Sequence, residues 1–179
     1  MTNVPLVESD IAPPSIRSVY EEFCRRMQFP SPPNFITVQG HSNAATRGIW
    51  ELLKNVLLGG TIPRWKKELI IVAISRDRNC QYCEAAHLAC CTMLGVGAEY
   101  MVRDVNGLPD AVLRDSILFA MKSARDPRGL TDSDFAVLAK HGIPQSEMIE
   151  LISVSGLAVY LNIIADATAV ETDAMMKGG

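Results

Sequence analysis

The apolar run at residues 69–74, Leu-Ile-Ile-Val-Ala-Ile, constrains the fold more than any other stretch of the chain. By period alone, six consecutive apolar residues fit either a buried strand or a buried helix. Thr61 and Pro63 precede the run as residues that cap and open a helix. No alternating pattern or hairpin turn elsewhere offers a second strand. We therefore expect a buried helix over about residues 63–77.

Start and stop signals divide the rest of the chain into further helices. Ser15 and Thr131 are caps, Gly59-Gly60 is a stop, and a proline-rich segment separates the first two helices. Helices are expected at about residues 15–28, 34–41, 43–58, 63–77, 80–94, 98–104, 110–124, 131–141 and 145–170. The predicted fold class is therefore an all-α helical bundle.

Length and composition indicate one domain. The chain has 179 residues and 48% hydrophobic residues, enough for a substantial core. Residues 1–14 contain three prolines and are expected to form an extended arm before a single helical domain at 15–179, whose redox motif occupies 68–87. The chain ends in a polar tail, Lys177-Gly178-Gly179. A formal net charge of −3 without a basic run argues against nucleic acid as a partner.

The segment from Leu151 to Val170 is apolar and long enough to raise the question of a membrane span. Ser153, Asn162 and Asp166 interrupt it, and a bilayer would penalise them, so the segment is expected to be a buried helix. Its apolar character also suggests a subunit interface. The N-terminus lacks the regions of a secretory signal, which predicts a cytoplasmic protein without membrane contact.

Cys80, Cys83 and His87 form the motif that carries chemistry. We expect Cys80 in the first turn of a helix capped by Asp77 or Asn79, with the three side chains in one column. The helix N-terminus and a nearby imidazole both favour a thiolate. Helical neighbours sit about 5–6 Å apart, whereas a disulfide needs Cβ atoms roughly 3.5–4.5 Å apart. A bond between the cysteines should thus form yet be easily reduced, as in a redox couple.

Other interpretations of the motif remain open. The same side chains are three zinc ligands, and a fourth would come from His41 or His141. Haem attachment requires a histidine directly after the second cysteine, where this chain has Glu84. The remaining interpretation is that the cysteines only pack in the core, which also fits Cys24 and Cys91. Cys90 shares the helical column of Cys83 and His87. It is either a packed apolar residue, a further resolving thiol or a metal ligand. We expect no bound cofactor and no resident metal.

Glu68, twelve positions before Cys80, completes a recognisable pattern with Tyr82 and Ala86. This pattern resembles the alkylhydroperoxidase-D-like branch of the carboxymuconolactone decarboxylase superfamily, over about residues 60–100, and the segment 162–167 resembles the family's last helix. The resemblance implies an all-helical fold, assembly into homotrimers or homohexamers, and a thiol-dependent peroxidase or disulfide reductase. It also implies a proton relay made of Glu68, Cys80, Cys83 and His87. The best-known members carry a histidine where this chain has Tyr82, and a phenol is a poor base because it titrates near pH 10.

The resulting hypothesis is an antioxidant thiol oxidoreductase. The dithiol Cys80/Cys83 would reduce a small hydroperoxide or accept electrons from another dithiol or a protein donor, His87 would transfer protons, and Glu68 would orient His87 or relay protons. Helix position favours Cys80 as the attacking thiol, whereas proximity to His87 favours Cys83. The alternatives are a carboxymuconolactone decarboxylase-like small-molecule lyase and a zinc-binding module that uses the same Cys and His residues.

Overall fold

The computed structural model describes residues 2–176, and within them it contains helices and turns but no strand, which confirms the predicted all-α class. The α-helices are α1 (Pro14–Met27), α2 (Asn34–Thr37), α3 (Asn43–Leu52), α4 (Arg64–Asp77), α5 (Gln81–Met93), α6 (Ala111–Arg125), α7 (Asp132–Lys140) and α8 (Gln145–Thr168). The polar tail at 177–179 lies outside the described residues.

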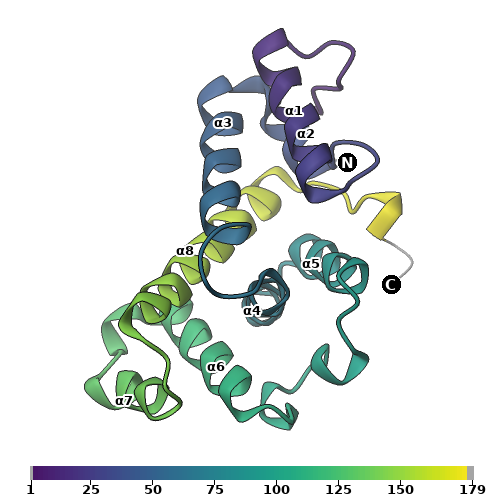
Figure 1. Ribbon diagram of the computed structural model, residues 1–179. Coiled ribbons are helices and arrows are strands. Elements are labelled where there is room, and N and C mark those ends of the chain that lie inside the picture. The colour runs from purple at the N-terminus through teal and green to yellow at the C-terminus, as the bar shows by residue number, and fades with distance from the viewer. Residues whose placement is uncertain (1, 177–179) are drawn as a thin grey trace.

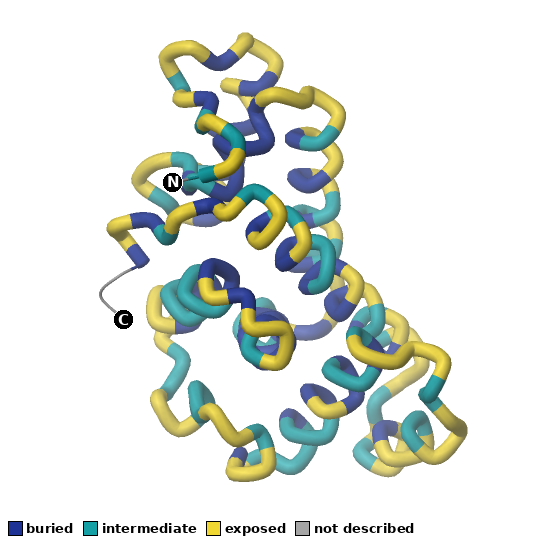
Figure 2. Tube along the Cα trace, turned by 180° about the vertical axis from the view of Figure 1, so that it is seen from behind, coloured by how far each residue is buried: buried dark blue, intermediate teal, exposed yellow. Residues whose placement is uncertain are grey.

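Helix α4 lies at the centre of the molecule, where α5, α6 and α8 surround it (Figure 1). Its residues from Lys67 to Ser75 are all buried. In Figure 2, buried residues are dark blue, and they gather at the centre of the molecule. A helix enclosed on every side needs apolar residues on every face. This explains why the run at 69–74 shows no helical period, and it confirms that the run is helical.

Several helix ends differ from the expectation. Ser15 does not cap α1, which begins at Pro14 after Pro13 and has no side-chain cap. The segment expected to be helical at 98–104 forms only a short 3-10 turn, Ala98–Tyr100, and a second 3-10 turn, Val105–Gly107, follows it. Each turn is followed by backbone outside the helical region, so neither propagates.

The helix expected at 43–58 changes geometry partway. Helix α3 ends at Leu52 and continues as a π-helical segment, Leu53–Leu57. The preceding expected helix at 34–41 likewise consists of α2 followed by a 3-10 turn, Val38–His41. The π-helical segment turns Leu53 and Leu57 into the protein interior, where both are buried.

Helix α8 is long and apolar enough to cross a membrane by length and composition, but half of its most apolar window is buried in the protein. It packs against α4, α5 and α6. Asn162, fully buried on α8, donates a 3.0 Å hydrogen bond from Nδ2 to Ser75 Oγ on α4. Helix α8 is therefore a core helix, as the interrupting polar residues predict.

The N-terminal segments and the end of the chain enclose one side of α5. The arm joins the fold through the backbone of Val7, whose N–H donates to Thr37 O at 3.1 Å. After α8 the chain runs back along α5 to the 3-10 turn Ala174–Met176. Figure 1 shows α1–α3 above α5 and the end of the chain beside it. A space between these parts and α5 is lined by side chains from both.

Candidate active site

The start of α5 fixes the two cysteines of the motif. Asn79 adopts a left-handed conformation with φ 58°, and the Cys80 N–H donates to Ser75 O at 2.9 Å, closing the end of α4. Cys80 is the N-cap residue of α5, with extended backbone, and not a member of its first turn as the sequence suggested. Cys83 lies one turn into the helix, and both thiols are buried.

Glu68 and His87 meet between α4 and α5. His87 Nδ1 lies 2.5 Å from Glu68 Oε2, and Arg64 Nε donates to Glu68 Oε1 at 2.9 Å. A carboxylate only accepts hydrogen bonds, so Nδ1 carries a hydrogen and Nε2 is the ring nitrogen that can exchange a proton in the pocket. The Glu68 side chain is fully buried, and its two oxygens bond to two different partners, which holds the His87 ring in one orientation.

The two thiols interact directly. A hydrogen bond with Cys80 and burial raise the pKa of Cys83 above its usual range, while a hydrogen bond from Asn162 lowers it. The raised pKa favours the protonated form of the Cys83 thiol in the resting protein. Asn162 is hydrogen-bonded to Ser75 of α4 and also lowers the pKa of Cys83, so it connects the core helices with the site.

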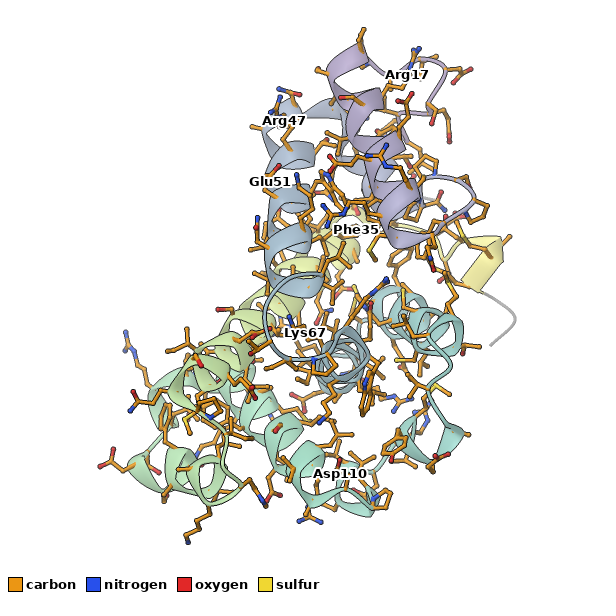
Figure 3. The ribbon with its side chains drawn as sticks, in the orientation of Figure 1. Arg17, Phe35, Arg47, Glu51, Lys67 and Asp110 are labelled. Carbon is orange, nitrogen blue, oxygen red and sulfur yellow. The ribbon has the colours of Figure 1, made fainter. Side chains whose placement is uncertain are left out.

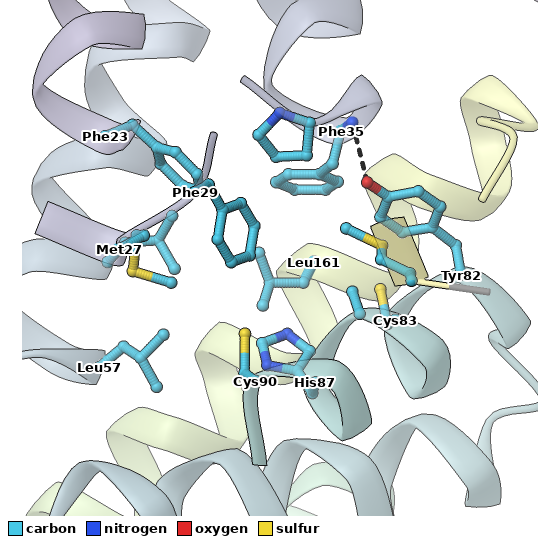
Figure 4. Close-up of a pocket in the computed structure, with 14 residues that line it drawn as sticks. Phe23, Met27, Phe29, Phe35, Leu57, Tyr82, Cys83, His87, Cys90 and Leu161 are labelled. Carbon is cyan, nitrogen blue, oxygen red and sulfur yellow. Dashed lines mark hydrogen bonds between the residues drawn. The ribbon is translucent and has the colours of Figure 1, made fainter. Parts of the chain in front are cut away.

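An apolar pocket opens in front of Cys83 and His87 (Figure 4). Its lining residues come from seven segments: Phe23, Met27, Phe29, Pro33, Phe35, Leu53, Leu57, Tyr82, Cys83, Ala86, His87, Cys90, Leu161 and Met176. Cys80 is not among them and is completely shielded from solvent. The pocket therefore exposes one member of the cysteine pair and keeps the other behind it.

Cys90 lies on the pocket wall one helical turn after His87. Burial raises its pKa, Glu68 adds to this, and the nearby Arg64 guanidinium, which hydrogen-bonds to its sulfur, acts in the opposite direction. Cys91 is buried in the core away from this pocket. The structure thus brings a third thiol to the site and leaves Cys91 and the half-buried Cys24 outside it.

Tyr82 plays no part in the contact between Glu68 and His87. Its hydroxyl donates to Asp173 Oδ2 at 2.7 Å and accepts a 3.1 Å hydrogen bond from the Phe35 N–H. Burial and the Asp173 carboxylate raise the pKa of the phenol far above its usual range. Asp173 also accepts from the Asn34 N–H at 2.9 Å. The tyrosine therefore fastens α5 to α2 and to the end of the chain.

The histidines proposed as a fourth zinc ligand lie elsewhere. His41 Nε2 is 2.8 Å from Pro5 O, and His141 Nε2 is 2.8 Å from Asp115 Oδ2. Within residues 2–176, no group of three or more Cys, His, Asp and Glu side chains is arranged to hold one metal ion. The geometry thus gives the zinc interpretation no support.

Arg64, Asn162 and Asp173 are site residues that the sequence interpretation did not assign. Arg64 stands four residues before Glu68, a spacing that places two side chains on one helical face and was available as a signal. Asn162 and Asp173 are 79 and 90 positions after Cys83, so only the tertiary structure brings Asn162 to Cys83 and Asp173 to Tyr82.

Comparisons with known proteins find one similar family and several similar folds. The sequence model of the carboxymuconolactone decarboxylase family matches residues 43–102, which include Glu68, both cysteines and His87. A search of curated proteins finds no match.

Similar solved structures share the fold along almost the whole chain. One is described as an alkylhydroperoxidase AhpD core, a peroxidase-related protein from Ralstonia eutropha JMP134, with TM-score 0.87, 20% identity, and 98% of this chain and 94% of that chain covered. A peroxidase-related protein from Silicibacter sp. TM1040 gives TM-score 0.86 and 23% identity over 99% and 94% of the two chains. The debrominase Bmp8, solved in complex with 2,3,4-tribromopyrrole, gives TM-score 0.78 and 20% identity over 98% and 93%.

These likenesses establish the fold, and the family match covers the part of the chain that carries the cysteines and their partners. The chain therefore has the fold of these peroxidase-related structures, and its residues 43–102 are similar to the carboxymuconolactone decarboxylase family.

Proposed function

We propose that this protein is a thiol-dependent oxidoreductase that reduces a hydroperoxide with the dithiol Cys80/Cys83. One observation carries the proposal: Cys83 and His87 line one pocket, with Cys80 hydrogen-bonded behind Cys83 and Glu68 bonded behind His87. A nucleophile, a resolving thiol and an oriented base thus occupy adjacent positions. The peroxidase-related descriptions of two structural neighbours are in accord with this reaction.

Cys83 is the attacking thiol in this proposal, because a nucleophile must come within about 3–3.5 Å of its substrate. Cys83 faces the pocket, whereas Cys80 is sealed from it. Cys80 lies at the N-terminus of α5, but a thiol without access to the substrate cannot attack it. Since the proton rests on Cys83, His87 Nε2 must remove it as the reaction begins.

The first step forms one bond and breaks another. The Cys83 sulfur attacks one peroxide oxygen, the O–O bond breaks, and the leaving alkoxide takes a proton from His87 to give an alcohol. Cys83 becomes a sulfenic acid. The Cys80 thiol then attacks the Cys83 sulfur, the disulfide forms, and the hydroxyl leaves as water. Two thiols and one hydroperoxide thus give one disulfide, one alcohol and one water.

An external dithiol returns the protein to its starting state by thiol–disulfide exchange. The cysteines are one helical turn apart at the beginning of α5, where the chain is extended at Cys80 and has more freedom to close a disulfide than within the helix. The donor is a small dithiol or a protein that carries one, and it acts after the alcohol has left the pocket.

The test is a count of free thiols after reduced protein is mixed with an organic hydroperoxide. Wild type should lose two thiols, and Cys80→Ser should stop at a sulfenic acid on Cys83 that dimedone labels. Cys83→Ser should not react in the pocket. Labelling of Cys80 in the Cys83→Ser variant would show that the order of attack is reversed. Absence of peroxide-dependent oxidation in wild type would remove the peroxidase proposal.

The same variants separate the other two functions. A small-molecule lyase would keep its activity in the double variant Cys80→Ser/Cys83→Ser, because no thiol takes part in that reaction. A zinc-binding module would carry near-stoichiometric zinc after purification without chelator and lose it in either single variant.

A further inference from the structure

We propose that Arg64 is a positioning residue of the site: through Glu68, its guanidinium sets the pH range over which His87 can take the proton of Cys83. The inference rests on the proposed function, in which His87 acts as that base. Arg64 does not line the pocket, so it acts on the reacting groups through the carboxylate of Glu68. The inference follows from the balance of charge in the buried contact between α4 and α5.

Arg64, Glu68 and His87 form one continuous chain of hydrogen bonds. Arg64 Nε lies 2.9 Å from Glu68 Oε1, and His87 Nδ1 lies 2.5 Å from Glu68 Oε2. Arg64 and Glu68 are four positions apart on α4, so adjacent turns of one helix hold them together. The carboxylate is thus shared between a permanent cation and an imidazole that can gain or lose a proton.

The carboxylate in this chain is shielded from solvent. The Glu68 side chain is 0% exposed, whereas the side chain of Arg64 is 19% exposed. A buried carboxylate is stable only beside a compensating positive charge. Arg64 supplies this charge at every physiological pH, because a guanidinium does not lose its proton. The group is therefore neutral while His87 is neutral, and it becomes positively charged when His87 takes up a proton.

The balance of charge would be reversed without Arg64. The Glu68 carboxylate and a neutral imidazole would together carry a buried negative charge, and uptake of a proton by His87 would remove it. An imidazole that already holds this proton cannot accept the proton of Cys83. Arg64 therefore keeps His87 available as a base at lower pH than Glu68 alone would allow.

The other titratable side chains of α5 around this contact are uncharged at neutral pH. They are Tyr82, Cys83, Cys90 and Cys91. Burial raises the pKa of Tyr82, Cys90 and Cys91. A hydrogen bond with Cys80, together with burial, raises the pKa of Cys83, and Asp166 on α8 adds to this. These groups therefore cannot compensate the charge of Glu68.

The other cations near the contact are bound elsewhere. Lys67 pairs with Glu150 on α8. Arg76 pairs with Glu84 on α5 at 2.8 Å. The pocket wall, to which α1, α2, the π-helical segment and α8 contribute, includes no Lys, Arg, Asp or Glu among the described residues. Within this part of the chain, Arg64 is thus the cation that compensates the buried carboxylate.

The place of Arg64 in its helix supports a role in the site. Helix α4 begins at Arg64. The first turn of a helix favours anions over cations, because the helix dipole is positive at that end. A cation at this position is therefore unfavourable by itself, and the ion pair with Glu68 compensates for it.

The pH dependence of Cys83 oxidation tests the inference. Rate constants for thiol loss with tert-butyl hydroperoxide are measured between about pH 5 and pH 9. In Arg64→Met, the pH at which the rate reaches half its plateau should rise by about one unit or more, because His87 keeps its proton to higher pH. Arg64→Lys keeps the charge, so its midpoint should lie closer to that of the wild type. An unchanged midpoint in Arg64→Met would overturn the inference.

Two further variants separate the charge of Arg64 from its other properties. Arg64→Gln keeps a hydrogen-bond donor without the charge and should raise the midpoint as Arg64→Met does, so it also serves if Arg64→Met does not fold. A wild-type midpoint in Arg64→Gln would contradict the inference. Arg103→Met removes the same charge from a side chain that is 84% exposed, and it should leave the midpoint unchanged. An equal rise in Arg103→Met would indicate a general charge effect and also contradict the inference.

NMR titration of the imidazole distinguishes this inference from the proposed reaction. The chain has three histidines, and His87→Gln identifies the signal of His87. In Arg64→Met, the midpoint of this signal should rise by about one pH unit or more, while those of His41 and His141 stay unchanged. This result supports the inference even if no hydroperoxide oxidises the wild type. If oxidation proceeds but the His87 midpoint does not move, the reaction stands and the inference fails.

Discussion

At the scale of single residues, the contact between Glu68 and His87 carries the greatest chemical consequence. Glu68 lies on the central helix, where nine consecutive residues are buried, and its carboxylate has two partners there. Arg64 balances its charge, and His87 takes its orientation from it. A base that is held in one orientation needs no reorganisation before it accepts a proton.

Glu68→Gln should therefore slow the reaction of Cys83 with hydroperoxide. The amide keeps the size of the side chain but loses the negative charge that supports a protonated imidazole, and we expect a fall in the second-order rate constant of roughly 10²-fold. Stopped-flow measurement of thiol loss checks this. Glu84→Gln is the matched control, since Glu84 pairs with Arg76 at 2.8 Å and does not line the pocket. A similar fall in both variants would show that the loss of charge alone, rather than the contact with His87, matters.

At the scale of elements, Lys67 holds the π-helical segment Leu53–Leu57 against α4 and α8. Its ammonium group donates to Val56 O at 2.8 Å and to Gly59 O, and it forms an ion pair with Glu150 on α8. Figure 3 shows Lys67, a residue of α4, near the end of α3. This buried lysine thus fixes the segment that supplies two leucines to the pocket wall.

Lys67→Met should destabilise the protein by about 3 kcal/mol, because it leaves Glu150 and two carbonyl groups without their charged partner. Urea denaturation followed by circular dichroism measures the change in the free energy of unfolding. The double variant Lys67→Met/Glu150→Gln should recover part of the loss, since it removes the unpaired charge. Full additivity of the two single changes would contradict a direct interaction between them.

The same pair predicts a dependence of stability on pH. Burial opposes ionisation of Glu150, but hydrogen bonds from Lys67 and the Thr61 N–H prevail and lower its pKa. Because its pKa is lower in the folded state, ionised Glu150 contributes fully to the free energy of unfolding above its unfolded-state pKa of about 4.3. This contribution is lost as the pH falls through the lower pKa of the folded state. In Lys67→Met, the loss of stability between about pH 6 and pH 3 should be smaller than in the wild type. Urea midpoints measured over this pH range check the prediction.

At the scale of the whole molecule, α8 presents two faces. One face packs in the core, while Ile149 is 63% exposed and Ile163 is 53% exposed on the other. Ile152 and Tyr160, which are half-buried, lie between them along the helix. Apolar side chains repeated along one exposed face favour burial by a second subunit, so a homotrimer or homohexamer remains our prediction.

Light scattering coupled to size-exclusion chromatography tests this prediction. Wild type should elute with the mass of three or six chains, and Ile163→Glu should shift it towards the monomer because a buried unpaired charge disfavours the interface. Ile11→Glu places the same change on the N-terminal arm, where Ile11 is 68% exposed, and should leave the mass unchanged. A monomeric wild type would end the prediction.

The sequence by itself determined the helical class, the approximate places of the helices and the group of Glu68, Cys80, Cys83 and His87. Capping residues, stops and spacings of three and four are local properties, and helices depend on contacts between near neighbours in the chain. Local signals failed where two choices were nearly equal, as at the start of α5, where Asn79 turned left-handed and Cys80 became the cap.

Only the tertiary structure decided which thiol faces a substrate and what surrounds it. The pocket wall combines side chains from α1, the loop to α2, α2 itself, the π-helical segment, α5, α8 and the 3-10 turn Ala174–Met176. Asn162 reaches Cys83, and Asp173 reaches Tyr82, across long separations in sequence. Burial and contact at such distances result from packing of the whole chain, which is why the motif could be found in the sequence and its environment could not.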